Sequence, residues 1–415
     1  MPRTSLAQAA TTLARRLNQL ARVSDERGAT TRTFLSPAMQ RANALVGRWM
    51  KGAGLSVRED SVANLIGRMP ASRRAAQTLL LGSHLDTVRD AGRFDGALGV
   101  LLPISALEVI RSRGLSLAFA VEVLGFSEEE GVRFSSAYLG SKGYTGRLKK
   151  SDLRLRDLYG TTVGEALAKR KGRAFSPGAV LRRNSLLGYL EVHIEQGPVL
   201  EARRLAAGVV SSIAGQTRAK LVFGGRAGHA GTTPMALRRD ALAGAAAFVL
   251  EVEAFAGRRP PLVATVGRIA AHPGASNVIA GSAEVSLDVR HPVDGKRRAA
   301  LRALTATGRR IAKRRGLSFS IEVIDDNDTV GCSKDLTSLL SQSVRAREGQ
   351  TFTLASGAGH DGVIVSSIAP IAMLFVRCRK GLSHHPDEFV AAGDLRAALE
   401  IVVDFLLRLS SRFER

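Results

Sequence analysis

Three short apolar runs, each ending in or followed by histidine or acid, most constrain how this chain can fold. They are Thr78–His84, Leu117–Phe126, which precedes three glutamates, and Leu187–Ile194, which carries His193. Such runs, bounded by glycine or polar residues, are typical of strands that are buried on both faces. A helical pattern over residues 96–113 separates the first two. This alternation predicts an α/β fold with a mostly parallel sheet flanked by helices, and sites at the carboxyl ends of its strands.

The sequence pattern changes near residue 213 and returns to the first type near 331. Between these points strand, helix, two strands, helix and strand succeed one another, at Thr217–Phe223, Arg238–Phe255, Leu262–Ile269, Ala283–Val289, Arg297–Arg315 and Ser318–Ile324. This order predicts a compact α+β insert of ferredoxin-like type. We therefore expect a larger domain made of residues 1–212 and 331–415, and a smaller inserted domain, 213–330. The larger domain should also contain helices at 36–53, 334–346 and 393–410, strands at 55–60 and 371–376, and a polar, helical segment at 149–185.

Composition excludes several classes of protein. The 415 residues, 45% of them hydrophobic, suffice for a large core, and no apolar run is long enough to span a bilayer. A net charge of +23 would suit a nucleic-acid or membrane partner, but the basic residues are spread along the chain and aromatic residues make up only 5%. We therefore expect neither partner.

Two features bear on the compartment. Cys332 and Cys378 are far apart and give no disulfide framework, which fits a reducing cytoplasm. The acid-free first 24 residues are compatible with an organelle transit peptide. Their leucine spacing also predicts an amphipathic helix over residues 6–20, and we expect this helix in a cytoplasmic protein.

Histidine and carboxylate residues recur in short, glycine-containing motifs spread over 300 residues. These motifs are Gly82-Ser-His84-Leu-Asp86, Arg93-Phe-Asp95-Gly96, Glu128-Glu129-Glu130-Gly131, Glu191-Val-His193-Ile-Glu-Gln196-Gly197, Gly228-His229-Ala-Gly231 and Leu382-Ser-His384-His385. Histidine and carboxylate are ligands of zinc and manganese. Each motif alone also has a structural interpretation, such as a helix cap for Asp95 or a satisfied core residue for a lone histidine. Together they predict a hydrolytic metal site.

Spacing suggests some roles within that site. Residues i and i+2 of a strand share a face, so Asp86 is expected to accept the second ring N–H of His84 or to orient it from nearby. Asp95, on a glycine-rich turn, can bridge two metals. Adjacent glutamates after a strand suit one metal ligand and one general base.

Together the motifs resemble the allantoate amidohydrolases and N-carbamoyl-L-amino-acid hydrolases, relatives of the dinuclear metallohydrolases of aminoacylase and carboxypeptidase type. The resemblance runs from about residue 30 to the end and also covers Gly228-His-Ala-Gly-Thr-Thr-Pro-Met235, Ser276-Asn277, Asp288-Val-Arg290 and Ser356-Gly-Ala-Gly-His-Asp361. It implies Glu129 as general base and five ligands for two divalent metal ions, with Asp95 bridging: His84, Asp95, Glu130, His193 and His384. Manganese or zinc is expected, with cobalt and nickel as alternatives. His385 replaces a usual Asn or Ser and competes with His384 for the ligand assignment.

The resemblance also assigns the insert as a lid and dimerisation domain of a homodimer. His229 would stabilise the oxyanion in the partner's site. Substrate contacts would come from Gln196, Gln216, His229, Asn277, Arg290 and Gly359, with Arg290 as the carboxylate clamp.

The expected reaction is hydrolysis of a ureido C–N bond in a small carboxylate. Phe126–Phe134 and Ala214–Arg218 are more similar to allantoate amidohydrolases than to carbamoylases. We therefore expect conversion of allantoate to ureidoglycine, a step of purine catabolism. An N-carbamoyl-L-amino acid or ureidoglycolate is the alternative, followed by a dipeptide or N-acyl amino acid, or a non-catalytic binding protein.

Overall fold

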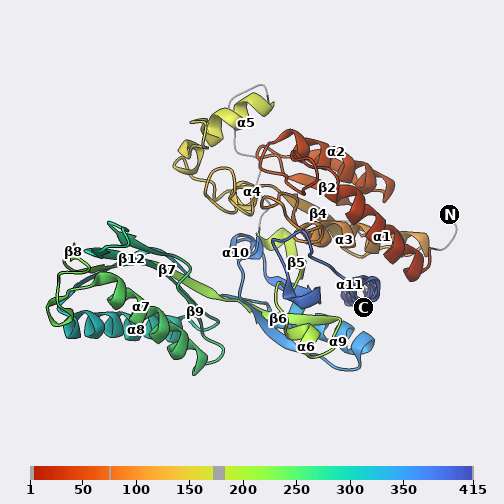
Figure 1. Cartoon of the computed structure of the whole chain (residues 1–415). Coiled ribbons are helices and arrows are strands. Elements are labelled where there is room, and N and C mark those ends of the chain that lie inside the picture. The colour runs from red at the N-terminus through yellow and green to blue at the C-terminus, as the bar shows by residue number, and fades with distance from the viewer. Residues whose placement is uncertain (1–3, 74–75, 172–182, 414–415) are drawn as a thin grey trace. The chain divides into compact units, whose positions relative to one another are not determined.

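The computed structural model describes residues 4–73, 76–171 and 183–413. The chain divides into two compact units, Met1–Ser211 with Gly331–Arg415, and Ser212–Val330 (Figure 1). No helix among the described residues is long and apolar enough to cross a membrane.

The first unit is built on a nine-stranded sheet in the order β1-β2-β4-β3-β5-β16-β6-β14, with β15 beside β6. The strands are β1 Ser56–Glu59, β2 Leu65–Met69, β3 Thr78–His84, β4 Ala120–Phe126, β5 Leu186–Ile194, β6 Ala207–Ile213, β14 Val330–Gly331, β15 Thr353–Ser356 and β16 Ile371–Val376. The central four, β4, β3, β5 and β16, are parallel, while β1, β2 and β6 pair antiparallel. The predicted fold class is confirmed, although the sequence pattern did not reveal β2, β6, β14 or β15.

Helices cover this sheet. They are α1 Leu6–Ala21, α2 Pro37–Gly52, α3 Ala97–Ser112, α4 Leu139–Tyr144, α5 Val163–Lys171, α6 Val199–Ala202, α9 Lys334–Glu348, α10 Gly362–Val365 and α11 Ala392–Ser411. Helix α3 contacts β3 on one side and α1 and α11 on the other, so nearly all its side chains are buried. Ser5 and Ser36 cap α1 and α2 through their side chains. Of the polar segment 149–185, residues 172–182 lie outside the described part of the chain.

The second unit has a sheet in the order β10-β12-β7-β13, with β9 also on β12, and every pairing is antiparallel. Its elements are β7 Gly215–Gly224, β8 Gly228–His229, α7 Ala241–Gly257, β9 Val263–Thr265, β10 Ile269–His272, β11 Val278–Ile279, β12 Ser282–His291, α8 Asp294–Arg314 and β13 Ser318–Asn327. Side chains of β12 alternate between buried and half-buried, and α7 and α8 pack on its buried face. This strand order is that of the ferredoxin-like arrangement.

Several element boundaries in this unit differ from the prediction; helix α8, for example, begins at Asp294 and not at Arg297. Leu262–Ile269 is two short strands, because the segment between Thr265 and Ile269 has one residue more than the stretch of β12 opposite it, from Asp288 to Val285. Helix α7 starts at Ala241 and not at Arg238, since the Asp240 side chain caps it by accepting the Ala243 N–H.

Candidate metal centre

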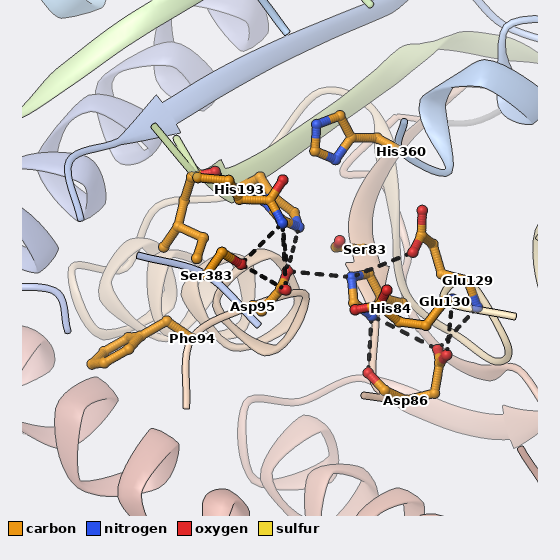
Figure 2. A network of polar contacts seen from close by, with 12 residues as sticks. Ser83, His84, Asp86, Phe94, Asp95, Glu129, Glu130, His193, His360 and Ser383 are labelled. Atoms are coloured by element: carbon orange, nitrogen blue, oxygen red, sulfur yellow. Dashed lines mark hydrogen bonds and ion pairs between the residues drawn. The ribbon is translucent and has the colours of Figure 1, made fainter. Parts of the chain in front are cut away.

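The parallel strands bring distant motifs to one edge of the sheet. His84 ends β3, Glu129 and Glu130 follow shortly after β4, and His193 is the penultimate residue of β5. Neighbouring parallel strands have their carboxyl ends at the same edge, so these side chains converge, as Figure 2 shows.

Two loops complete the cluster. Asp95 precedes α3, and Gly96 at the helix start has φ +63° and lies so close to the His84 ring that a Cβ there would be 2.4 Å from it. Glycine is thus required at this turn. His384 lies in the loop after Gly381, with φ +56°.

Asp95 lies at the centre of this cluster and directs its two oxygens to different partners. His193 Nε2 lies 3.1 Å and His84 Nε2 3.7 Å from Asp95 Oδ1. His384 Nε2 lies 3.1 Å from Asp95 Oδ2 and 3.4 Å from Glu130 Oε1. The ligand atoms form two sets that share Asp95, namely His84, Asp95 and His193, and Asp95, Glu130 and His384. This arrangement suits a carboxylate that bridges two cations.

The separations test whether cations fit. Ligand atoms about 2.0–2.2 Å from a tetrahedral cation lie about 3.3–3.6 Å apart. The separations of 3.1–3.7 Å around Asp95 are close to that range. Histidine and carboxylate donors suit manganese, zinc, cobalt or nickel. A third set of three, His84, Glu129 and Glu130, overlaps the others.

Hydrogen bonds fix which ring nitrogen faces Asp95. His84 Nδ1 lies 2.9 Å from the Asp86 carbonyl oxygen, and His193 Nδ1 lies 3.0 Å from that of Ile194. A carbonyl only accepts, so both Nδ1 atoms carry protons and both Nε2 atoms face the carboxylate. Nε2 must then either be protonated too or share a cation with Asp95.

Burial and neighbouring charges both shift the pKa values of the residues in the site. Burial opposes the charge on His84, but contact with Asp95 outweighs it and raises the pKa of His84 well above its usual value. Burial also acts against charge on Asp95, yet the contacts with His193 and His384 hold the pKa of Asp95 well below normal. Without cations, therefore, the histidines neutralise the central carboxylate with protons.

The acidic loop after β4 is held by Asp86. The backbone N–H groups of Glu129 and Glu130 donate to Asp86 Oδ1 and Oδ2, each at 3.1 Å. Asp86 orients His84 as expected, but through its backbone carbonyl oxygen. The Asp86 carboxylate oxygen Oδ1 lies 3.7 Å from His84 Nδ1. Glu128 turns away and accepts the backbone N–H groups of Arg133 and Phe134. Asp86 thus orients both a histidine and the acidic loop.

Burial raises the pKa values of the loop carboxyls. The pKa of Glu128 rises to about 8 and that of Glu130 to about 7. Desolvation also raises the pKa of Glu129 well above its usual value. Taking these carboxylates out of water is unfavourable unless a proton or cation compensates them.

The remaining predicted residues of the first unit lie around this cluster. His385 Nδ1 accepts the Asp387 N–H within its own loop (3.1 Å), so His384 is the histidine that faces Asp95. Gln196 Nε2 donates to Ser383 Oγ (3.1 Å), and it lies 3.4 Å from Asp95 Oδ2. A Cβ on Gly359 would lie 2.0 Å from the Tyr138 hydroxyl, so no side chain fits there.

The other predicted residues belong to the second unit, where they form two pairs. Gln216 and Arg290 face each other across β7 and β12, and both donate to Asp288. His229 is exposed, and the backbone N–H of the next residue, Ala230, donates to the Asn277 carbonyl (2.9 Å). The structure groups these residues only within their own unit.

Sequence reasoning missed three polar residues in contact with the cluster or next to it. Glu388 and Ser383 lie against Asp95, and Glu191 accepts the Ser83 hydroxyl (2.9 Å) and the Gly362 N–H (3.0 Å). Two sequence features could have indicated them. Glu388 is an acidic residue four positions after His384, and Glu191 is an acidic residue within an apolar strand.

Comparisons with known proteins agree with this geometry. Residues 80–408 match the model of peptidase family M20/M25/M40. The chain is 40% identical to allantoate deiminase 2 of Glycine max over 95% of this chain and 88% of that protein. It is 38% identical to the N-carbamoyl-L-amino-acid amidohydrolase of Pseudomonas sp. (strain NS671), over 91% and 92%. A hydantoinase/carbamoylase-family amidase from Burkholderia multivorans superposes with a TM-score of 0.90 at 32% identity, over 97% of this chain and 98% of that one. The predicted resemblance is confirmed, and the chain belongs to peptidase family M20/M25/M40 as an amidohydrolase.

Proposed function

We propose that this chain hydrolyses the ureido C–N bond of a small carboxylate, and that its substrate is allantoate. The main support is the position of Asp95, which directs one carboxylate oxygen to His84 and His193 and the other to His384. Glu129 lies next to this cluster, near His84. The choice of allantoate is supported by relatives named allantoate deiminase at 39–40% identity, against 33–38% for the N-carbamoyl-L-amino-acid amidohydrolases and 31% for a ureidoglycolate hydrolase. The N-carbamoyl-L-amino acids are the second candidates.

Two divalent cations would complete the site. His84, Asp95 and His193 would hold one, and Asp95, Glu130 and His384 the other. Manganese or zinc is proposed, with cobalt and nickel as alternatives. When bound, such cations lower the pKa of a water molecule toward neutrality and polarise the carbonyl to be attacked.

Glu129 is the proposed general base. It is 8% exposed, and its Oε2 lies 4.0 Å from His84 Nε2, at the edge of the cluster. A carboxylate whose pKa is raised by burial is suited to take a proton from water near neutral pH and return it. The water oxygen bonds to the ureido carbon, the C–N bond breaks, and Glu129 passes the proton to the leaving nitrogen. The carbamate released then decays to ammonia and carbon dioxide.

The insert would supply the substrate contacts and the dimer. Asp288 holds the Arg290 guanidinium through Nε and Nη2, both at 3.0 Å, beside Gln216. An oriented guanidinium is suited to clamp the substrate carboxylate. We propose that the insert closes as a lid, that it joins two copies in a homodimer, and that His229 stabilises the oxyanion of the partner's substrate. One such donor typically contributes about 3–4 kcal/mol to transition-state stabilisation.

A metal and substrate panel tests this proposal. Chelator-stripped protein is supplied with manganese, zinc, cobalt or nickel. It is assayed for ammonia released from allantoate, ureidoglycolate and several N-carbamoyl-L-amino acids, and for free amino acid released from a dipeptide. We expect metal-dependent turnover with the highest kcat/KM on allantoate. Higher kcat/KM on an N-carbamoyl-L-amino acid would establish the second candidate. Saturable allantoate binding without turnover under every metal would instead indicate a non-catalytic binding protein.

The carboxylate clamp has its own test. Arg290→Ala should raise KM for allantoate with little change in the metal titration. Unchanged KM would show that Arg290 does not bind the substrate.

We also propose a cytoplasmic location. The two cysteines are free thiols, which is compatible with it.

A further inference from the structure

Glu388 is a fully buried carboxylate that the proposed reaction does not use. It has 0% exposure and lies four residues after His384. Its Oε1 accepts two backbone N–H groups, from Phe94 at 2.7 Å and from Asp95 at 3.1 Å. A buried N–H group is costly to leave without an acceptor. Glu388 therefore holds the backbone of Asp95 from a loop almost 300 residues away.

A second link joins the loop of Glu388 to the Asp95 side chain. Ser383 Oγ lies 3.0 Å from Asp95 Oδ2 and 3.4 Å from Glu388 Oε2, and it accepts the Gln196 amide N–H at 3.1 Å. A hydroxyl has one proton, and the shorter contact gives that proton to Asp95. Figure 2 shows Ser383 beside Asp95. The serine thus contacts the same oxygen that faces His384.

Glu388 is closely packed against the loop that leads to Asp95. A Cβ on Gly92 would lie 2.3 Å from both Cβ and Cδ of Glu388, so the chain leading to Asp95 passes directly over this side chain. Among the described residues, no lysine, arginine or histidine lies within ion-pair distance of Glu388. Its interactions are therefore with the two loops and not with a cationic side chain.

We propose that Glu388 is a positioning residue that fixes Asp95 as the bridging carboxylate. Through the two N–H groups it sets the backbone of Asp95, while Ser383 of the same loop donates to Oδ2, the oxygen that faces His384. It thereby ties the loop of Asp95 to that of His384, whose side chains would share a cation. This inference rests on the proposed metal centre.

Metal titration of chelator-stripped full-length protein tests the inference. Calorimetry with manganese and with zinc should give two sites per chain for the wild type. Glu388→Ala leaves two buried N–H groups without an acceptor, and we expect about 10- to 100-fold weaker binding of at least one cation. Glu388→Gln is the matched control, because its amide oxygen can still accept both N–H groups in nearly the same volume. It should bind within a few-fold of the wild type.

Each result is decisive. Wild-type affinities in a folded Glu388→Ala protein would overturn the inference, and so would a Glu388→Gln variant as weak as Glu388→Ala. If Glu388→Ala does not fold, Ser383→Ala is the deciding variant, because it removes only one hydroxyl. We expect several-fold weaker binding of one cation. Unchanged binding of both cations would refute the link. A wild type that binds no cation would contradict the proposed metal centre itself.

Discussion

Asp86 should control activity without touching a cation. It is 1% exposed, and its two oxygens accept one backbone N–H each, from Glu129 and Glu130, at 3.1 Å. In Asp86→Asn one oxygen becomes an NH₂ group, which faces an N–H and cannot accept it. One bond to a charged acceptor, of about 1.5–3 kcal/mol, is lost, and the buried N–H left unpaired costs about 1–3 kcal/mol.

The loss falls on the general base, because the freed N–H belongs to the loop that carries Glu129. If about 2–3 kcal/mol of this loss appears in the transition state, kcat falls about 30- to 160-fold. The assay is ammonia release from allantoate at saturating manganese, with calorimetry to verify that two cations remain bound. Asp86→Ala removes both acceptors and should be slower still. A wild-type kcat in Asp86→Asn would refute this account of how the acidic loop is held.

Further predictions concern the base, the ligands, pH and salt. Glu129→Gln should lower kcat by about 10²- to 10⁴-fold while both cations still bind in calorimetry. His384→Ala should lose one of the two cations in metal analysis, whereas His385→Ala should retain both. Glu128 and Glu130 have folded pKa values of about 8 and about 7, above the unfolded value of 4.5, so the metal-free protein loses stability as pH rises from about 5 to 8. Manganese should accordingly raise Tm more at pH 8 than at pH 6. With a net charge of +23, kcat/KM on anionic allantoate should fall with added salt, and an unchanged value would exclude electrostatic steering.

The convergence of the proposed metal ligands was predictable because most of them follow elements with strong sequence patterns. The runs ending in His84 and containing His193 are buried strands in the structure, and parallel pairing forces their ends together. Motif order then identified the family. The pattern of apolar and polar residues along the sequence indicates burial and the type of element, which is sufficient to locate the ends of strands.

The missing parts depend on loop conformation and on contacts between distant residues. Residues with positive φ, such as Gln196 and His384, take directions that no periodic pattern encodes, so only the structure could show which histidine of the pair faces Asp95. The bond from Glu388 to the Phe94 N–H spans 294 residues and leaves no local signal. Similarly, Asp86 acts through its carbonyl as well as its carboxylate.

Anomalous diffraction from crystals of the manganese- or zinc-loaded protein tests the central claim most directly. The account predicts two anomalous peaks per chain, about 3.5–4 Å apart, with Asp95 between them. His84 and His193 should lie at one peak, and Glu130 and His384 at the other. A lone peak, or two peaks that do not share Asp95, would contradict it.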